Sequence, residues 1–208
     1  MIDRRKVLQS GVVVSAAAVS PSVLLASASA EQPARSLLRP ARFVVDTRFR
    51  ESIVTGQAAQ AAGLNVVEVD GDLSRLWYDD LDLAWRQAPM VLAGVTGPDG
   101  LFVLETLAND RGMRLVFRGD HGRLANGTER HSMHGTPDAL RACMSGFGRS
   151  VSPWGAPMCA ALTGLSAGRQ TMSRIELGTP SIAAARETGT LVSWVIAPRG
   201  VATPILRA

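Results

Sequence analysis

Four short apolar segments alternate with helical patterns over residues 43–117, and this alternation constrains the fold more than any other feature of the chain. The strand-like apolar segments are residues 43–45, 64–69, 90–95 and 113–117. Helical spacing of apolar residues fills the segments between them, residues 51–62, 72–87 and 98–112. Successive strand–helix units predict a parallel sheet covered by helices. We therefore expect an α/β domain, a three-layer Rossmann-like or flavodoxin-like sandwich with a mostly parallel sheet.

The pattern changes after residue 118, so we expect an irregular C-terminal third. Residues 120–135 are polar, contain Asn126-Gly127, and predict a hairpin or a long loop. The remaining expectations are a helix from Thr136-Pro137 through Cys143, a loop over 146–157, a helix from Thr179-Pro180 to Gly189, and a last strand over 191–196. Whether that last strand lies antiparallel at an edge of the sheet is left open.

The first thirty residues have the composition of an export signal. Arg4 and Arg5 open it, a weakly apolar stretch follows over residues 12–25, and Ala28-Ser29-Ala30 supplies a small-residue cleavage site. An ordinary Sec signal has the same parts. The apolar stretch is short for a bilayer span of roughly 20 residues, so we expect no permanent membrane anchor.

Residues 3–9, Asp-Arg-Arg-Lys-Val-Leu-Gln, resemble the twin-arginine (Tat) signal family, in which two arginines are followed after one residue by an apolar pair. Asp3, Val7 and Gln9 differ from the commonest residues at their positions. The resemblance covers residues 1–30 alone. It implies transport of the folded protein by the Tat translocase, cleavage after Ala30 and a periplasmic address. An extended leader over 31–41 and a single domain over 42–208 would then remain.

The chain is close to neutral outside the signal. Removing Arg4, Arg5, Lys6 and Asp3 from the 22 basic and 18 acidic residues leaves 19 and 17, a net charge of +2. Because charges of both signs are interspersed, this composition argues against a dedicated nucleic-acid binder, which needs a clustered basic face.

Both cysteines, Cys143 and Cys159, lie in the C-terminal third. An exported protein meets an oxidising environment, so the pair predicts a disulfide that closes a short loop. Reduced and buried thiols are the alternative.

Polar residues follow the predicted strands at the edge where α/β sheets bind ligands. They are Asp46 and Arg48, Asp70 and Asp72, Thr96 and Asp99, and Asp120 and His121. Carboxylates that share an edge can hold Mg²⁺ or Mn²⁺, which activates water for hydrolysis. We name Asp46, Asp120 and His121 as candidate catalytic residues, with His121 as the base beside Asp120 and a divalent metal as candidate cofactor. Helix capping is the alternative role for Asp72 and Asp99.

Residues 94–100, Gly-Val-Thr-Gly-Pro-Asp-Gly, are a second candidate site because they follow a strand and open a helix. Glycines in such a turn let backbone N–H groups approach a phosphate, as in the dinucleotide fingerprint. Here the spacing is G-x-x-G-x-x-G, and Pro98 removes one donor. The candidate ligand-binding residues are Arg48, Asp70, Thr96, Gly97 and the predicted loop residue Trp154.

Three histidines, His121, His131 and His134, together with the two cysteines, are donors of the types that bind zinc or copper. No C-x-x-C or H-E-x-x-H motif accompanies them. We therefore commit to no set of metal ligands.

Two classes of function fit these residues. The first is an exported binding or accessory subunit of unknown ligand, associated with a larger periplasmic subunit; it agrees with folded Tat cargo and with the lack of a G-x-S-x-G nucleophile motif. The second is a small metal-assisted periplasmic hydrolase. Nucleotide or phosphate binding at residues 94–100 is a further alternative, and whether the protein is an enzyme stays open.

Overall fold

A computed structural model describes residues 37–124, 128–147, 154–166, 168–180, 190–200 and 202–205. The signal predicted for residues 1–30 lies outside these residues, as do most of the leader and nearly all of the helix predicted up to Gly189. No helix among the described residues is both long and apolar enough to span a membrane.

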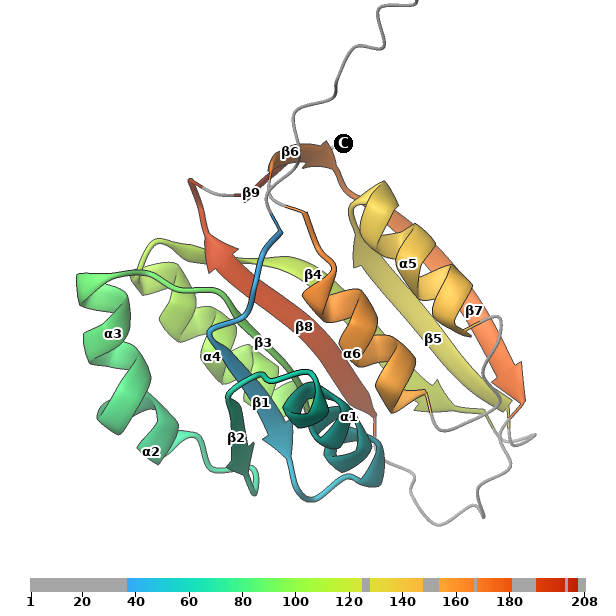
Figure 1. Cartoon of the computed structure of the whole chain (residues 1–208), viewed down its shortest axis with the longest axis horizontal. Coiled ribbons are helices and arrows are strands. Elements are labelled where there is room, and N and C mark those ends of the chain that lie inside the picture. Colours follow the sequence, from blue (N-terminus) through green and yellow to red (C-terminus); the bar gives the residue numbers. More distant parts are fainter. Residues whose placement is uncertain are drawn as a thin grey trace, which may run out of the picture. The chain divides into compact units, whose positions relative to one another are not determined.

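A mixed sheet of seven strands forms the centre of the domain, in the order β2-β1-β3-β8-β4-β5-β7 (Figure 1). Its strands are β1 (Arg42–Asp46), β2 (Val66–Val69), β3 (Leu92–Thr96), β4 (Met113–Arg123), β5 (Thr128–Gly135), β7 (Ser173–Pro180) and β8 (Leu191–Pro198). Strand β1 pairs in parallel with β2 and β3, whereas the other four pairings are antiparallel. A separate parallel pair joins β6 (Gly168–Thr171) to β9 (Ala202–Ile205).

The α/β class is thus confirmed, but the mostly parallel arrangement is wrong, and the structure does not confirm a Rossmann or flavodoxin type. The difference comes from β8, which inserts between β3 and β4 and runs antiparallel to both. Residues 191–197 are all buried. A continuous apolar run of this kind is typical of a strand covered on both faces, which explains why β8 occupies the centre instead of an edge.

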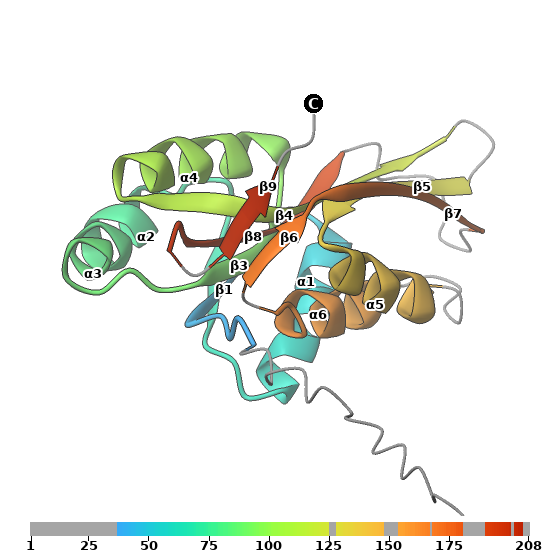
Figure 2. The same cartoon turned by 90° about the horizontal axis from the view of Figure 1, so that it is seen from above.

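Helices cover both faces of the sheet (Figure 2). One face carries α1 (Arg50–Ala61), α5 (Pro137–Phe147) and α6 (Gly155–Thr163); the other carries α2 (Ser74–Leu76), the π-helical turn η1 (Trp77–Leu81), α3 (Asp82–Gln87) and α4 (Pro98–Asp110). Each face buries its own apolar cluster. The loop predicted over 146–157 instead contains the start of α6, and Thr179-Pro180 ends β7 instead of opening a helix.

The turn η1 changes which side chains of its helix face the core. The Asp82 N–H bonds to the Trp77 carbonyl, five residues back, so the helix gains one residue in this turn. Leu76, Leu81 and Trp85 are consequently buried on one face. Trp77 is only half-buried and lies beside solvent.

The predicted disulfide between Cys143 and Cys159 does not form. Cys143 lies on α5 and Cys159 on α6, and both thiols are free and buried in the same apolar cluster. Burial raises the pKa of Cys143 to about 12 and also raises the pKa of Cys159, because an apolar surrounding disfavours the thiolate. Both cysteines therefore act as small apolar core residues.

Candidate functional site

A buried ion pair stands at the carboxyl end of β1. Asp46 is 1% exposed and accepts two hydrogen bonds from the Arg48 guanidinium, Nε to Oδ1 at 2.9 Å and Nη2 to Oδ2 at 2.7 Å. The backbone N–H groups of Arg48 and Gly97 also donate to this carboxylate, at 3.2 and 3.3 Å. Arg48 Nη2 reaches Asp99 Oδ2 on α4 at 3.2 Å. The network ties the ends of β1 and β3 to the start of α4.

The same contacts keep the Asp46 carboxyl ionised and the Arg48 guanidinium protonated. Burial by itself would raise the pKa of the Asp46 carboxyl, but hydrogen bonds from the Arg48 side chain and from the Gly97 and Arg48 amides outweigh it and lower the pKa. The hydrogen bond to Asp46 raises the pKa of Arg48. Asp46 is thus an ionised carboxylate whose oxygens are already occupied, which suits a structural pair better than a base or a metal ligand.

Gly71, in the turn after β2, lets the chain pass close to this pair. Its φ of 100° belongs to the left-handed region, and a Cβ built on it would lie 2.5 Å from Arg48 Cζ. Any larger residue would therefore both strain the turn and displace the guanidinium.

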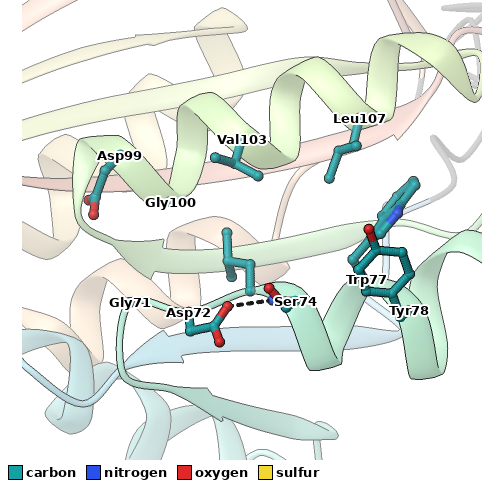
Figure 3. Close-up of a pocket in the computed structure, with 10 residues that line it drawn as sticks. Gly71, Asp72, Ser74, Trp77, Tyr78, Asp99, Gly100, Val103 and Leu107 are labelled. Carbon is teal, nitrogen blue, oxygen red and sulfur yellow. Dashed lines mark hydrogen bonds between the residues drawn. The ribbon is translucent and has the colours of Figure 1, made fainter.

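A groove of about 330 Å³ opens next to this network, between η1 and α4 (Figure 3). We call it the η1–α4 groove. Its lining residues are Gly71, Asp72, Leu73, Ser74, Trp77, Tyr78, Asp99, Gly100, Val103 and Leu107. Figure 3 shows the carboxylates of Asp72 and Asp99 at one end and the rings of Trp77 and Tyr78 at the other. The groove therefore has an anionic end and an apolar end.

The apolar end is unusually open for side chains of its type. Tyr78 is 76% exposed and Val103 is 41% exposed, and Leu107 and Trp77 are half-buried. Arg111 lies over the Trp77 ring, 5.5 Å from its centroid, and holds the ring in place at the far wall. Tyr78, Val103 and Leu107 were not among the site residues expected from the sequence. A signal for the last two existed, because residues 101–104 together with Leu107 make α4 apolar on nearly every side, which leaves an apolar flank for something other than the sheet.

Asp46 and Asp120 do not meet. The register pairs Val45 with Val95, and it pairs both Thr96 and Asp120 with Val192. Asp46 follows Val45, so it lies three strands from Asp120, close to the same row across β1, β3, β8 and β4. Three strand spacings put the two backbones roughly 14 Å apart. One metal ion cannot bind both carboxylates, because oxygen ligands lie only about 2–2.6 Å from it. Asp120 instead pairs with Arg118, Nη2 to Oδ1 at 2.7 Å.

Asp120 and His121 do not form an acid–base pair either, because successive residues of a strand point to opposite faces. His121 faces the α1–α5–α6 side, where it stacks on Trp154 with ring centroids 4.2 Å apart. Trp154, expected in a ligand-binding loop, is 3% exposed and belongs to the core at the start of α6. It is therefore shielded from solvent ligands.

A chain of buried polar groups runs through His121. Its Nδ1 lies 2.8 Å from Nδ1 of His131 on β5, and its Nε2 lies 2.8 Å from Ser193 Oγ on β8. All three residues are almost fully buried. Burial lowers the pKa of His131 to about 4, and burial together with the charge of His131 lowers the pKa of His121 well below its ordinary value. Both rings are neutral at pH 7, with one Nδ1 donating and the other accepting.

The candidate metal donors do not converge as one set, although His121 and His131 are in contact. His131 is buried on one face of β5, and His134, three residues later, points to the opposite face. Among the described residues, no group of three His, Cys, Asp or Glu side chains could hold a metal ion.

The glycines of residues 94–100 serve packing and the ion pair. A Cβ on Gly94 would lie 2.4 Å from the Val44 carbonyl oxygen and 2.8 Å from Trp194 Cζ2. The Gly97 N–H is bonded to Asp46, and Asp99 lies against the same glycine. A phosphate here would meet the carboxylates of Asp46 and Asp99.

Thr96 is buried. Its hydroxyl accepts a hydrogen bond from Trp194 Nε1 and donates one to the Gly97 carbonyl, both at 3.0 Å.

The chain has no match among protein-family models, curated proteins or solved structures.

Proposed function

We propose that the protein is an exported binding or accessory protein whose ligand site is the η1–α4 groove. The observation that carries the proposal is a groove of about 330 Å³ with aromatic and aliphatic walls and two carboxylates at one end. Pockets that bind small molecules have this size range and this mixture of an apolar lining with a few polar groups. The larger periplasmic subunit expected from the sequence remains part of the proposal.

The position of the groove supports a ligand site. Its anionic end, at Asp72 and Asp99, lies at the carboxyl ends of the parallel strands β2 and β3, where loops and helix starts of α/β sheets converge on ligands. The Asp46–Arg48–Asp99 network fixes one end of the groove. A site with a rigid rim loses little conformational entropy on binding.

The lining defines the class of ligand. Tyr78, Val103 and Leu107 offer apolar surface to an aromatic or aliphatic body, and Asp72 and Asp99 face its polar end. Asp72 is exposed, accepts a hydrogen bond from the Ser74 N–H at 2.8 Å, and has a lowered pKa because of hydrogen bonds from Ser74. We expect a small organic ligand with an apolar body and a cationic or hydrogen-bond-donating end.

The alternatives have weaker support. A metal-assisted hydrolase needs carboxylates that converge, and Asp46 and Asp120 lie three strands apart. Phosphate binding at residues 94–100 needs free amides and no competing negative charge, whereas Asp46 already occupies the Gly97 N–H.

The test uses two probes with the same ring and opposite charge, phenethylamine and phenylacetate, titrated into the ¹⁵N-labelled full chain. We expect phenethylamine to shift the amides of residues 71–78 and 99–107 saturably, and phenylacetate to bind at least fivefold more weakly. Tyr78→Ala should weaken phenethylamine binding severalfold. The matched control is Leu83→Ala, because Leu83 is also exposed but lies outside the groove. Equal effects of the two substitutions, or shifts elsewhere, would refute the proposed site.

A further inference from the structure

The outer edge of β2 is an unpaired strand edge within the described part of the chain. Strand β2 ends the sheet, and its only pairing there is with β1. The Phe43 N–H donates to the Asn65 carbonyl and the Thr47 N–H to the Val69 carbonyl. Since backbone groups alternate sides along a strand, residues 65, 67 and 69 face β1. Val66 and Glu68 therefore direct their N–H and C=O groups outward.

A second groove lies along this edge, between β2 and the α2–η1 helix, with a volume of about 610 Å³. Figure 1 shows α2 beside β2 at the end of the sheet. We call this space the β2-edge groove. Its apolar lining comes from Val67, Val69 and Leu76. An edge strand facing a helix across a groove is the arrangement in which an extended peptide adds a strand to a sheet, with main-chain hydrogen bonds on one side and side-chain contacts on the other.

The negative charge of the β2-edge groove favours a cationic segment as its occupant. Five acidic residues line it, Glu68, Asp70, Asp72, Asp79 and Asp80, against one basic residue, Arg75.

Only part of this negative charge is compensated within the domain. Asp80 bonds to Arg42 at 2.8 Å, and Arg75 approaches Asp79 at 3.9 Å. The side chains of Asp70 and Asp72 accept hydrogen bonds from backbone N–H groups, and both residues are exposed. An anionic groove of this kind attracts cationic side chains and repels acidic ones.

We infer that the β2-edge groove is a docking surface for an extended segment of a partner polypeptide that carries arginine or lysine at alternate positions. The segment adds an eighth strand to the sheet by pairing with Val66 and Glu68. Its cationic side chains reach the carboxylates of Asp72, before α2, and of Asp79 and Asp80 on η1. This surface is separate from the proposed ligand site, since the two grooves share only Asp72 among their lining residues.

The test measures binding of the fluorescent peptide dansyl-Arg-Val-Arg-Val-Arg-amide to the full chain by fluorescence anisotropy at 150 mM salt. Two matched peptides accompany it. One replaces each arginine by glutamate, and the other keeps the arginines but is N-methylated at the valines and the central arginine, which blocks strand pairing while preserving charge. We expect the parent peptide to bind, the glutamate peptide to show no binding, and the N-methylated peptide to bind at least tenfold more weakly.

Variants locate the site. Glu68→Pro removes an outward N–H that β1 does not use, a change tolerated on edge strands, and should weaken binding tenfold. Glu68→Gln, which removes only the charge, should weaken it less. Glu176→Gln on β7, at the opposite edge, is the control and should leave affinity unchanged. If Glu68→Pro fails to fold, the N-methylated peptide still decides the question.

Three outcomes would overturn the inference: equal binding of the parent and N-methylated peptides, no binding of the parent peptide, or self-association of the chain through this edge in analytical ultracentrifugation. Phenethylamine titration of Glu68→Pro separates the two proposals. Unchanged phenethylamine binding with lost peptide binding assigns the peptide to the β2 edge.

Discussion

The Arg48 guanidinium donates two hydrogen bonds to the Asp46 carboxylate, at 2.9 and 2.7 Å, and thereby pairs a partly exposed cation with a fully buried anion. A buried carboxylate is tolerated only when its oxygens are paired and hydrogen-bonded. Here the Gly97 N–H completes the set, and Arg48 continues to Asp99 on α4. This pair joins the carboxyl ends of two strands to the rim of the η1–α4 groove.

Arg48→Ala should destabilise the fold by about 2 kcal/mol, because it leaves the Asp46 charge buried without its main partner. The partial exposure of Arg48 keeps the loss below that of a fully buried pair. Urea unfolding at pH 7 measures it. Arg86→Ala, which removes an exposed pair with Asp82, is the control and should change stability by less than about 0.5 kcal/mol. Similar losses for both variants would show that the Asp46 pair is no stronger than a surface pair.

The free energy of unfolding should fall as the pH drops from 6.5 toward 4. In the folded protein burial lowers the pKa of His131 to about 4 and holds the pKa of His121 well below its ordinary value, whereas both histidines have values near 6.5 when unfolded. The unfolded chain therefore binds protons first, and each histidine contributes a slope of about 1.4 kcal/mol per pH unit. Urea unfolding at several pH values measures this slope.

His131→Gln removes one of the two protons taken up on unfolding, so it should reduce that slope by about 1.4 kcal/mol per pH unit. His134→Gln is the matched control, because His134 lies on the opposite face of β5 from the buried pair, and it should keep the steep dependence. A slope that falls in His134→Gln and not in His131→Gln would exclude the buried pair as its source.

Gly94→Ala should destabilise the fold by about 3 kcal/mol or prevent folding. The added methyl group would lie 2.4 Å from the Val44 carbonyl oxygen, a backbone atom of the neighbouring strand that cannot move away without breaking the sheet. Gly122→Ala is the control, because no atom lies within 4 Å of its Cβ position. Thermal unfolding should separate the midpoints of the two variants by roughly 6–12 °C. Equal midpoints would show that β1 and β3 can separate to admit the methyl group.

Replacing both signal arginines, Arg4→Lys and Arg5→Lys, should abolish transport if the Tat route is used, because that signal depends on the arginine pair. We expect the variant chain to accumulate inside the cell at its full mass, while the unchanged chain appears in the periplasm beginning at Glu31. Cell fractionation with intact-mass analysis measures both. Continued export of the double variant would favour the Sec route.

Much of the N-terminal half could be predicted from the sequence, because the signals that define its strands and helices are local. Five elements lie within a few residues of their predicted positions: strands β1, β2 and β3 and helices α1 and α4. Their sequence signals, the spacing of apolar residues and the glycines that end helices, depend only on neighbouring residues. The continuous apolar run of residues 191–196 likewise predicted a strand. It did not reveal the place of β8, since strand order depends on contacts with β3 and β4, roughly 75 to 100 residues earlier in the chain.

In the candidate site, too, the sequence predicts local positions, whereas the contacts depend on the tertiary structure. Sequence placed Asp46, Arg48, Thr96 and Gly97 at the carboxyl edge of the sheet, because the end of each strand is a local property. Only the tertiary structure decided what these residues contact: Asp46 takes Arg48 as its partner, and Asp120 lies three strands away because β8 separates β4 from β3. The η1–α4 groove likewise depends on a one-residue shift in helical register and on packing between two helices, neither of which leaves a pattern within one segment of sequence.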